Sequence, residues 1–264
     1  MNAHSMAGVL FLLPYLLLCT LLVVEGVEQL CFWLGFFSCE CLIRFPCGKI
    51  LLQVLAMADS EVETLSLGAA EFSMEEAQGL SAVLGEKHSI KSLVIARGFK
   101  DSWKSICALG TVLKEVPHLE HLSLAGLRVD GFCLEPLSCP GVCSHLRILQ
   151  LNENRLGECG GRHVATLVEN APCLRVLRLE DGGLGDEGVA HLCKGLQSAS
   201  CLVELTLAGN NIGDQGASAL AGVLGTGTPP LKLLSLAGIA PLRVSVGIPF
   251  LFDVHPNCKV TPLS

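Results

Sequence analysis

The most constraining feature of this sequence is a phrase that recurs along the chain. The pattern L-x-x-L-x-L begins at Leu146 and again at Leu174 and Leu202, at intervals of 28 residues. Weaker copies extend the series in both directions, with repeat starts near residues 62, 90, 119, 146, 174, 202 and 231. Seven starts spaced 27 to 29 residues apart indicate stacked copies of one supersecondary unit.

Each unit combines a strand half with a helix half. Alternation along a strand places Leu149 and Leu151 on one side and the intervening residues on the other. Further along, apolar residues recur at helical spacing, as at Val189, Leu192 and Leu196. One strand and one helix cannot bury both faces alone, whereas stacked neighbours can. The sequence therefore predicts an α/β fold with an inner parallel sheet and an outer layer of helices.

The turn after each strand carries its own signal. Asn154 and Asn210 occupy the same position in two repeats, and an amide there is suited to bond turn backbone. We predict structural roles for both, although Gly182 replaces this asparagine in the repeat between them. A further glycine recurs in the first helical turn, where we expect it to avoid a Cβ clash. It stands at Gly160, Gly188 and Gly216.

The units resemble leucine-rich repeats, specifically the ribonuclease-inhibitor-like type with 28–29-residue repeats, as in NOD-like receptors and Ran GTPase-activating proteins. The resemblance covers about residues 62–240 and is strongest over 146–238. It implies a right-handed solenoid, or horseshoe, with parallel strands on the concave face and helices on the convex face. It also implies protein partners bound on the concave face and a location in the cytosol or nucleus, of which we predict the cytoplasm.

Residues 1–56 are set apart from the predicted repeat domain, which spans 57–264. Residues 7–24 carry no charge, and eighteen such residues suffice for a membrane span or a signal peptide. From Met57 the sequence becomes polar and patterned. The first segment is therefore interpreted as a membrane anchor, a signal, an extension without a folded role, or a packed cap. A membrane-anchored location is the alternative to a cytoplasmic one.

Fourteen cysteines suggest disulfides, but a chain of this length does not need them for stability. We predict buried, reduced thiols. Cys173 and Cys201 share one position before successive strands, which favours small apolar packing. A C-x-C core resembling the amino-terminal cap of extracellular leucine-rich repeat proteins supports the alternative of a membrane-tethered or secreted receptor ectodomain. It lies among Cys31, Cys39, Cys41 and Cys47, whose redox state the sequence leaves open.

The repeat beginning at Leu119 departs from the pattern. Pro136 and Pro140 stand where its helix should run, which predicts an irregular loop. Four zinc-ligand residue types gather there, at Cys133, Cys139, Cys143 and His145. Their spacing matches no usual zinc site, so no metal site is predicted. His163 and His191 occupy equivalent helix positions and are expected to be solvated. After Pro241 the pattern dissolves into a cap or a degenerate repeat.

Charge and missing motifs exclude several functions. A formal net charge of −7 argues against a nucleic-acid module, which would carry a basic face. The chain has no phosphate loop, no H-E-x-x-H and no G-x-S-x-G, so we predict no enzyme, no catalytic residue and no cofactor. A regulator of a small GTPase remains a third hypothesis, because such proteins act by positioning residues of their partner.

The best candidate site is the outward face of the strands. Its residues are Gln150, Asn152, Arg178, Glu180, Glu204 and Thr206. A central arginine flanked by polar groups is typical of binding hot spots, while a self-satisfied salt network is the alternative interpretation. The sequence thus predicts a protein–protein interaction module, a scaffold or sensor, whose partner it does not name.

Overall fold

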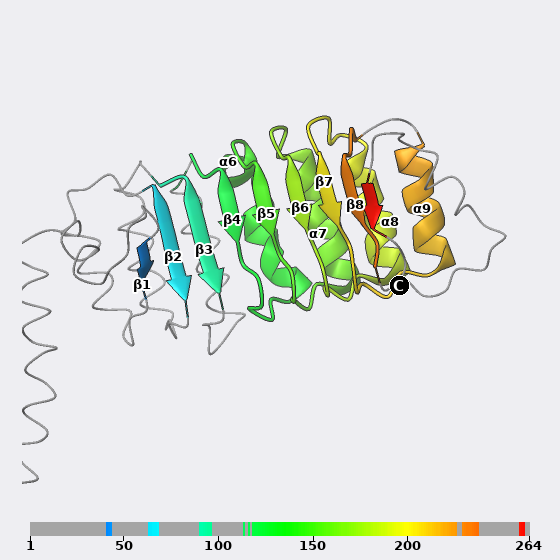
Figure 1. Cartoon of the computed structure of the whole chain (residues 1–264), viewed down its shortest axis with the longest axis horizontal. Coiled ribbons are helices and arrows are strands. Elements are labelled where there is room, and N and C mark those ends of the chain that lie inside the picture. Colours follow the sequence, from blue (N-terminus) through cyan, green and yellow to red (C-terminus); the bar gives the residue numbers. More distant parts are fainter. Residues whose placement is uncertain are drawn as a thin grey trace, which may run out of the picture.

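The computed structural model describes residues 41–43, 63–68, 90–96, 113, 116, 118–225, 229–237 and 259–261. Within them, nine strands form one parallel sheet in sequence order (Figure 1). The strands are β1 (Cys41–Ile43), β2 (Thr64–Gly68), β3 (Ser92–Ala96), β4 (His121–Ser123), β5 (Ile148–Gln150), β6 (Val176–Arg178), β7 (Glu204–Thr206), β8 (Leu233–Ser235) and β9 (Lys259–Thr261). The helices are the 3-10 helix η1 (Gly131–Ser138) and the α-helices α6 (Pro140–Cys143), α7 (Gly157–Glu169), α8 (Gly185–Leu196) and α9 (Asp214–Leu224).

The strand register reproduces the sequence period. Ser92 pairs with His121, His121 with Ile148, and Ile148 with Val176, so partners lie 29, 27 and 28 residues apart. The two end strands have no counterpart among the predicted repeats. β1 pairs with β2 from within segment 1–56, and β9 pairs with β8 from the tail beyond Pro241.

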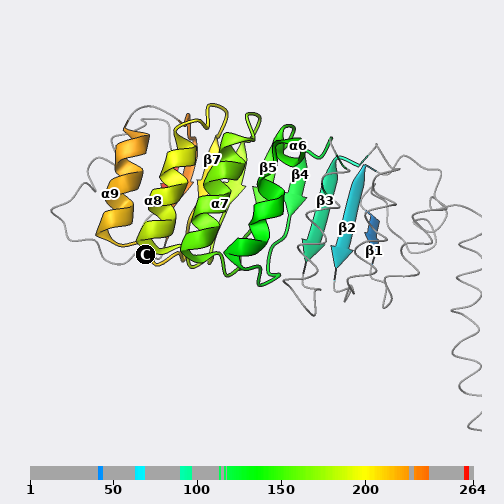
Figure 2. The same cartoon turned by 180° about the vertical axis from the view of Figure 1, so that it is seen from behind.

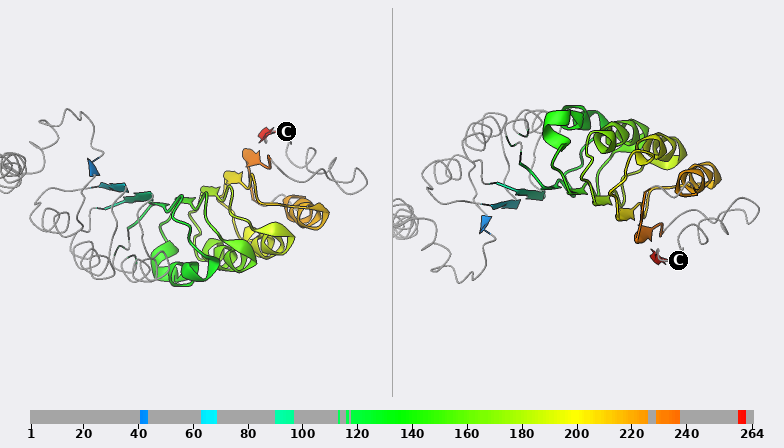
Figure 3. Two further views of the ribbon diagram at one scale, coloured as in Figure 1. Left: turned by 90° about the horizontal axis from the view of Figure 1, so that it is seen from below. Right: turned by 90° about the horizontal axis from the view of Figure 1, so that it is seen from above.

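The described helices all lie on one side of the sheet, as the view from behind shows (Figure 2). Seen along the strands, the sheet bends away from the helices, so that strands line the concave side and helices the convex side (Figure 3). This arrangement confirms the predicted α/β solenoid. It leaves the outward face of the strands β4–β8 uncovered by the described helices.

The core runs as a continuous layer between the sheet and the helices. Leu149, Leu151 and Leu177 are fully buried on the strand side, and Val189 and Leu192 are fully buried on the helix side. Each such side chain contributes about 1.5–3 kcal/mol through burial. The predicted leucine and helix stripes are therefore the two halves of one core.

The predicted irregular loop around Pro136 and Pro140 is wrong. This segment forms η1, with Pro136 inside it, followed by α6 with Pro140 in its first turn. A short 3-10 helix accommodates proline better than a long α-helix, and the first helical position needs no N–H partner. Leu134 and Leu137 are fully buried, so this repeat also closes its core.

Close helix contacts depend on glycine. A Cβ at Gly161 would overlap the backbone of Gly188, and a Cβ at Gly195 would overlap that of Ala165. Helices α7 and α8 therefore approach each other backbone to backbone. The predicted role of Gly160 agrees with its surroundings, since a Cβ there would lie 2.5 Å from the Cβ of Leu156.

Candidate binding surface

The register places three of the candidate residues side by side. Gln150, Arg178 and Thr206 occupy paired positions on β5, β6 and β7. Ser123 on β4 and Ser235 on β8 extend this row. Gln150 and Arg178 are half-exposed, whereas Thr206 is only 5% exposed and its Oγ1 has no partner among the described residues. Arg178 is thus the largest reachable group in the row.

Arg178 is held in place by a neighbour on the next strand. Its Nε donates to Oε1 of Glu204 at 2.7 Å, and the two side chains are 40% and 20% exposed. An arginine has five N–H donors, so this contact leaves most of the guanidinium fork available. The pair itself contributes at most about 1 kcal/mol to stability, because it faces solvent.

His121 is a residue of this face that sequence reasoning missed. Its Nδ1 lies 3.0 Å from Oγ of Ser92 on β3, while its Nε2 is buried without a partner among the described residues. Burial lowers the pKa of His121, and the Arg178 guanidinium lowers it further. The imidazole is therefore neutral at pH 7. His121 pairs with Ser92 in the strand register, and the equivalent position of these two polar residues in successive repeats is the sequence feature that could have identified it.

Asn152 and Glu180 stand at the ends of β5 and β6. Oδ1 of Asn152 accepts a hydrogen bond from the backbone N–H of Glu180 at 3.0 Å. Asn152 thus ties two repeats together, and the carboxylate of Glu180 remains half-exposed. Of the two, Glu180 is the better placed to meet a partner.

Asn154 and Asn210 bond the turns of two repeats each. Asn154 donates to the carbonyls of Leu124 and Leu151 and accepts from the N–H of Val129 at 2.9 Å. Asn210 donates to Leu179 and Leu207 and accepts from two N–H groups of the preceding repeat. Both side chains are buried. Their role is structural, and neither reaches the outward face.

Asp186 is a second residue that the sequence did not reveal. Its carboxylate Oδ1 accepts from the N–H groups of Gly213 and Gly216, at 2.7 and 2.9 Å. Gly213 is the N-cap residue of α9 and Gly216 lies in its first turn, so Asp186 on α8 caps the helix of the next repeat. Because the capping carboxylate comes from the preceding repeat, no capping residue next to α9 in the sequence predicts it.

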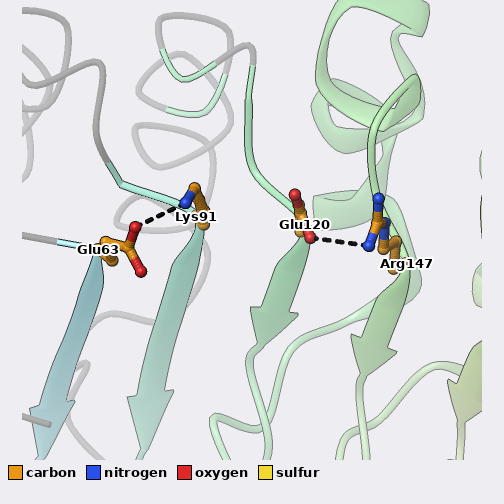
Figure 4. Close-up of polar contacts among 4 residues, drawn as sticks. All are labelled: Glu63, Lys91, Glu120 and Arg147. Carbon is orange, nitrogen blue, oxygen red and sulfur yellow. Dashed lines mark hydrogen bonds and ion pairs between the residues drawn. The ribbon is translucent and has the colours of Figure 1, made fainter. Parts of the chain in front are cut away.

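Charged residues line the edge where the strands begin. Lys91 Nζ lies 2.6 Å from Glu63 Oε1, and Arg147 lies 3.4 Å from Glu120 (Figure 4). Arg175 continues this series, with one edge residue per repeat, and is exposed. The edge therefore changes from paired charges to positive charge along the solenoid.

The free cysteines among the described residues range from buried to exposed. Burial raises the pKa of the Cys143 and Cys193 thiols to about 12, with Cys139 adding to the shift at Cys143. Cys173 and Cys201 are free and exposed, so the predicted apolar packing at their shared position is wrong. That position precedes the first buried leucine of each repeat and lies at the surface. Exposed His118 and His145 occupy it in earlier repeats, with ring centroids 5.7 Å apart.

Over the described ranges, no three His, Cys, Asp or Glu side chains gather as a metal site would require. His191 is not fully solvated, because its Nε2 lies 3.6 Å from Glu158, which also pairs with Arg162. His163 is likewise half-buried. Cys31, Cys39 and Cys47 lie outside the described residues, and of Cys41 only its place in β1 is described.

The candidate membrane span near the amino terminus also lies outside the described residues. Residues 7–24 are not among the described residues. Of the helices that are described, none has both the length and the apolar character needed to cross a bilayer.

Comparison with protein families agrees with the repeat geometry. The model of the leucine-rich repeat family matches residues 170–193 and 198–221. These segments hold β6 with most of α8, and β7 with most of α9. The matched segments of this solenoid are leucine-rich repeats. No curated protein sequence matches this chain.

Solved structures similar to this chain are distant. The crystal structure of TLR13 in complex with ssRNA13 shares 18% identity at a TM-score of 0.47, covering 79% of this chain and 30% of that one. An internalin, InlF from Listeria monocytogenes str. 4b F2365, shares 15% identity at a TM-score of 0.44, covering 81% of this chain and 63% of that one. The chain thus spans less than two thirds of either protein.

Proposed function

We propose that this leucine-rich repeat protein is an interaction module, a scaffold or sensor that binds a protein partner on the outward face of strands β4–β8. The observation that carries the proposal is the half-exposed Arg178, central in a polar row and anchored to Glu204 at 2.7 Å. Repeat solenoids use their extended concave surfaces for binding. Arginine is among the residues that dominate binding energy at interfaces.

The anchoring of Arg178 favours binding over a purely structural role. A guanidinium already fixed by one contact loses little freedom when a partner arrives, which lowers the cost of association. Gln150 supplies a further half-exposed polar group beside it. A broad surface of this kind supports affinity without turnover, and no cofactor is part of the proposal.

A cytoplasmic location is proposed as well. Free thiols at Cys159, Cys173 and Cys201 suit a reducing compartment. The intact mass and cell fraction of the endogenous protein test this. A chain starting near Met57 in the soluble fraction is the expected result, whereas a full-length chain in membranes, or a chain cut near Gly26 with oxidised cysteines, contradicts it.

The binding proposal is tested by quantitative capture from cells with Arg178→Glu. Lys194→Glu is the matched control, because Lys194 is exposed on the convex side in α8. Partners captured by the parent protein are expected to be lost with Arg178→Glu and retained with Lys194→Glu. Since Arg178→Glu leaves two carboxylates together, the neutral double variant Arg178→Gln/Glu204→Gln is included, and melting curves establish folding. Unchanged capture by both concave-face variants contradicts the proposal.

A further inference from the structure

The outward face of strands β5–β8 is divided into three bands that run across the strands. The basic and apolar bands take equivalent positions from the repeats of β5, β6 and β8, and the β7 repeat has Val203 and Glu204 at those positions. The acidic band belongs to the repeats of β5 and β6. The basic band is Arg147, Arg175 and Lys232, at the strand starts. The apolar band is Ile148, Val176 and Leu233, one position further on. The acidic band is Glu153, Glu180 and Asp181, beyond the strand ends.

The basic band carries a net charge of about +2 at neutral pH. All three of its side chains are exposed. Arg147 shares the carboxylate of Glu120 at 3.4 Å, whereas Arg175 and Lys232 have no acidic partner within the described part of the chain. Arg147 and Arg175 are neighbours in the stack, since the N–H of Arg175 bonds the carbonyl of Arg147 at 2.8 Å. Two adjacent like charges at a protein edge favour an acidic partner.

The apolar band offers contact area in the middle of the face. Ile148, Val176 and Leu233 are each half-exposed. Glu204 stands between Val176 and Leu233 in the register, but its charge is already met by Arg178 at 2.7 Å. A partner can therefore cover this band without burying an unpaired charge. An apolar centre between charged margins is the usual anatomy of a protein interface.

The acidic band closes the opposite margin. Glu153 and Asp181 are exposed and Glu180 is half-exposed. Arg155 lines the same shallow pocket as Asp181, so three carboxylates and one guanidinium leave a net charge of −2. The face is consequently polarised, positive along one margin and negative along the other.

We propose that this face binds an amphipathic helix of a protein partner, laid across the strands, with acidic residues on one flank and basic residues on the other. The inference rests on the proposed function and names the chemistry of its partner. Adjacent strands lie about 4.8 Å apart, and one helical turn advances about 5.4 Å. A helix can therefore place one side chain on each successive strand through its i, i+3 and i+4 positions.

An extended segment fits this spacing less well. Its side chains on one face repeat every 6.6–6.8 Å or so, which falls out of step with the strands within two repeats. The distance from β5 to β8 is about 14 Å at three strand spacings. A helix covers it in about ten residues, so a short amphipathic helix matches the length of the basic and apolar bands and passes the acidic band beside β5 and β6.

The test uses the full chain and synthetic helical peptides of about five turns labelled with fluorescein. The mixed peptide carries leucine along one stripe, glutamate on one flank and lysine on the other. Comparison peptides carry glutamate on both flanks or lysine on both, and a fourth has the mixed composition with two central prolines. At low ionic strength we expect the mixed peptide to bind about tenfold tighter than each comparison peptide, with the preference lost at high salt. Equal affinity for the mixed and same-charge peptides overturns the proposal. Equal affinity for the mixed and proline peptides also overturns it, because the bound segment would then be extended and not helical.

A charge-reversal variant locates the contact. Arg175→Glu is expected to weaken binding of the mixed peptide about fivefold and to strengthen binding of the lysine-flanked peptide. The matched control Lys194→Glu should change neither affinity. If both variants behave alike, the basic band is not the contact and the proposal falls. Loss of cellular partners with Arg178→Glu, without any peptide preference, would retain the proposed function and overturn only this inference.

Discussion

At the scale of single residues, buried asparagines hold the turns together. Asn154 makes three hydrogen bonds to backbone groups of two repeats, at 2.8 to 2.9 Å. The turn after each strand has backbone groups that need hydrogen-bond partners, and this turn recurs with the strand pattern. The sequence could therefore predict a structural role for Asn154. In the repeat between those of Asn154 and Asn210, Gly182 stands in place of the asparagine and cannot bond the turn itself. Its N–H instead donates to Oδ1 of Asn210 in the next repeat, which the repeat pattern does not predict.

Asn154→Ala is expected to lower the free energy of unfolding by about 1–3 kcal/mol, because buried turn backbone loses its partners. Urea denaturation measures this change. Gln215→Ala, at an exposed site in α9, should change stability by less than about 0.5 kcal/mol. Matching midpoints for Asn154→Ala and the parent protein would contradict the assigned role.

His121 predicts a pH dependence of stability. Burial and Arg178 lower its pKa from the ordinary value of 6.5 in the folded protein, so the unfolded chain takes up the proton more readily. The stabilising contribution is present above about pH 6.5 and is lost as pH falls toward the lower folded pKa. His121→Asn, whose amide can still meet Ser92, should flatten the change in unfolding free energy between about pH 7 and 5. His118→Asn, at an exposed site, should leave that slope in place, and equal slopes for parent and His121→Asn would contradict the account.

At the scale of elements, the helices are spaced by glycine rather than by side chains. Gly161 and Gly195 each stand where a Cβ would meet backbone of the neighbouring helix. The need for glycine at these positions comes from the adjacent helix and not from the residues next to them in the sequence. A glycine inside a helix pattern signals only a local cost, so the sequence could not identify them as contact points.

Gly161→Ala is expected to destabilise the protein by about 1–3 kcal/mol, because α7 and α8 must separate. The control is Gly222→Ala in α9, where no atom lies within 4 Å of the added methyl group. That variant should stabilise the helix by about 0.5–1 kcal/mol. Thermal melting of both variants measures the difference, and the same sign for both would refute the backbone contact.

Other elements escaped prediction for related reasons. The 3-10 helix η1 contains Pro136. Proline in the middle of an expected α-helix predicts a loop, but the tighter 3-10 helix accommodates it. β1 and β9 are three residues long and pair only at the sheet ends. The strands β5–β8 are equally short, but repeated leucines mark them in the sequence, whereas Cys41 and Val260 stand where β2 and β8 have Leu65 and Leu234.

At the scale of the whole molecule, repetition makes the fold predictable and the surface much less so. Stacking needs the same leucines in every repeat, so the period predicts the sheet, the helices and the register. The outward positions carry no such requirement. Arg178 and Glu204 could be placed on one face from the sequence, but their contact and the environment of His121 depend on side-chain conformations that only neighbouring strands determine.

The central claim, that a partner binds the outward face of the strands, is most directly tested by carboxylate footprinting of the protein with and without its captured partner. Glu153 and Glu180 report on the outward face, while Glu169 on α7 and Glu187 on α8 report on the helix side. Binding is expected to reduce labelling of Glu153 and Glu180 and to leave labelling of Glu169 and Glu187 unchanged. Protection of the helix carboxylates with full labelling of Glu153 and Glu180 would contradict the account.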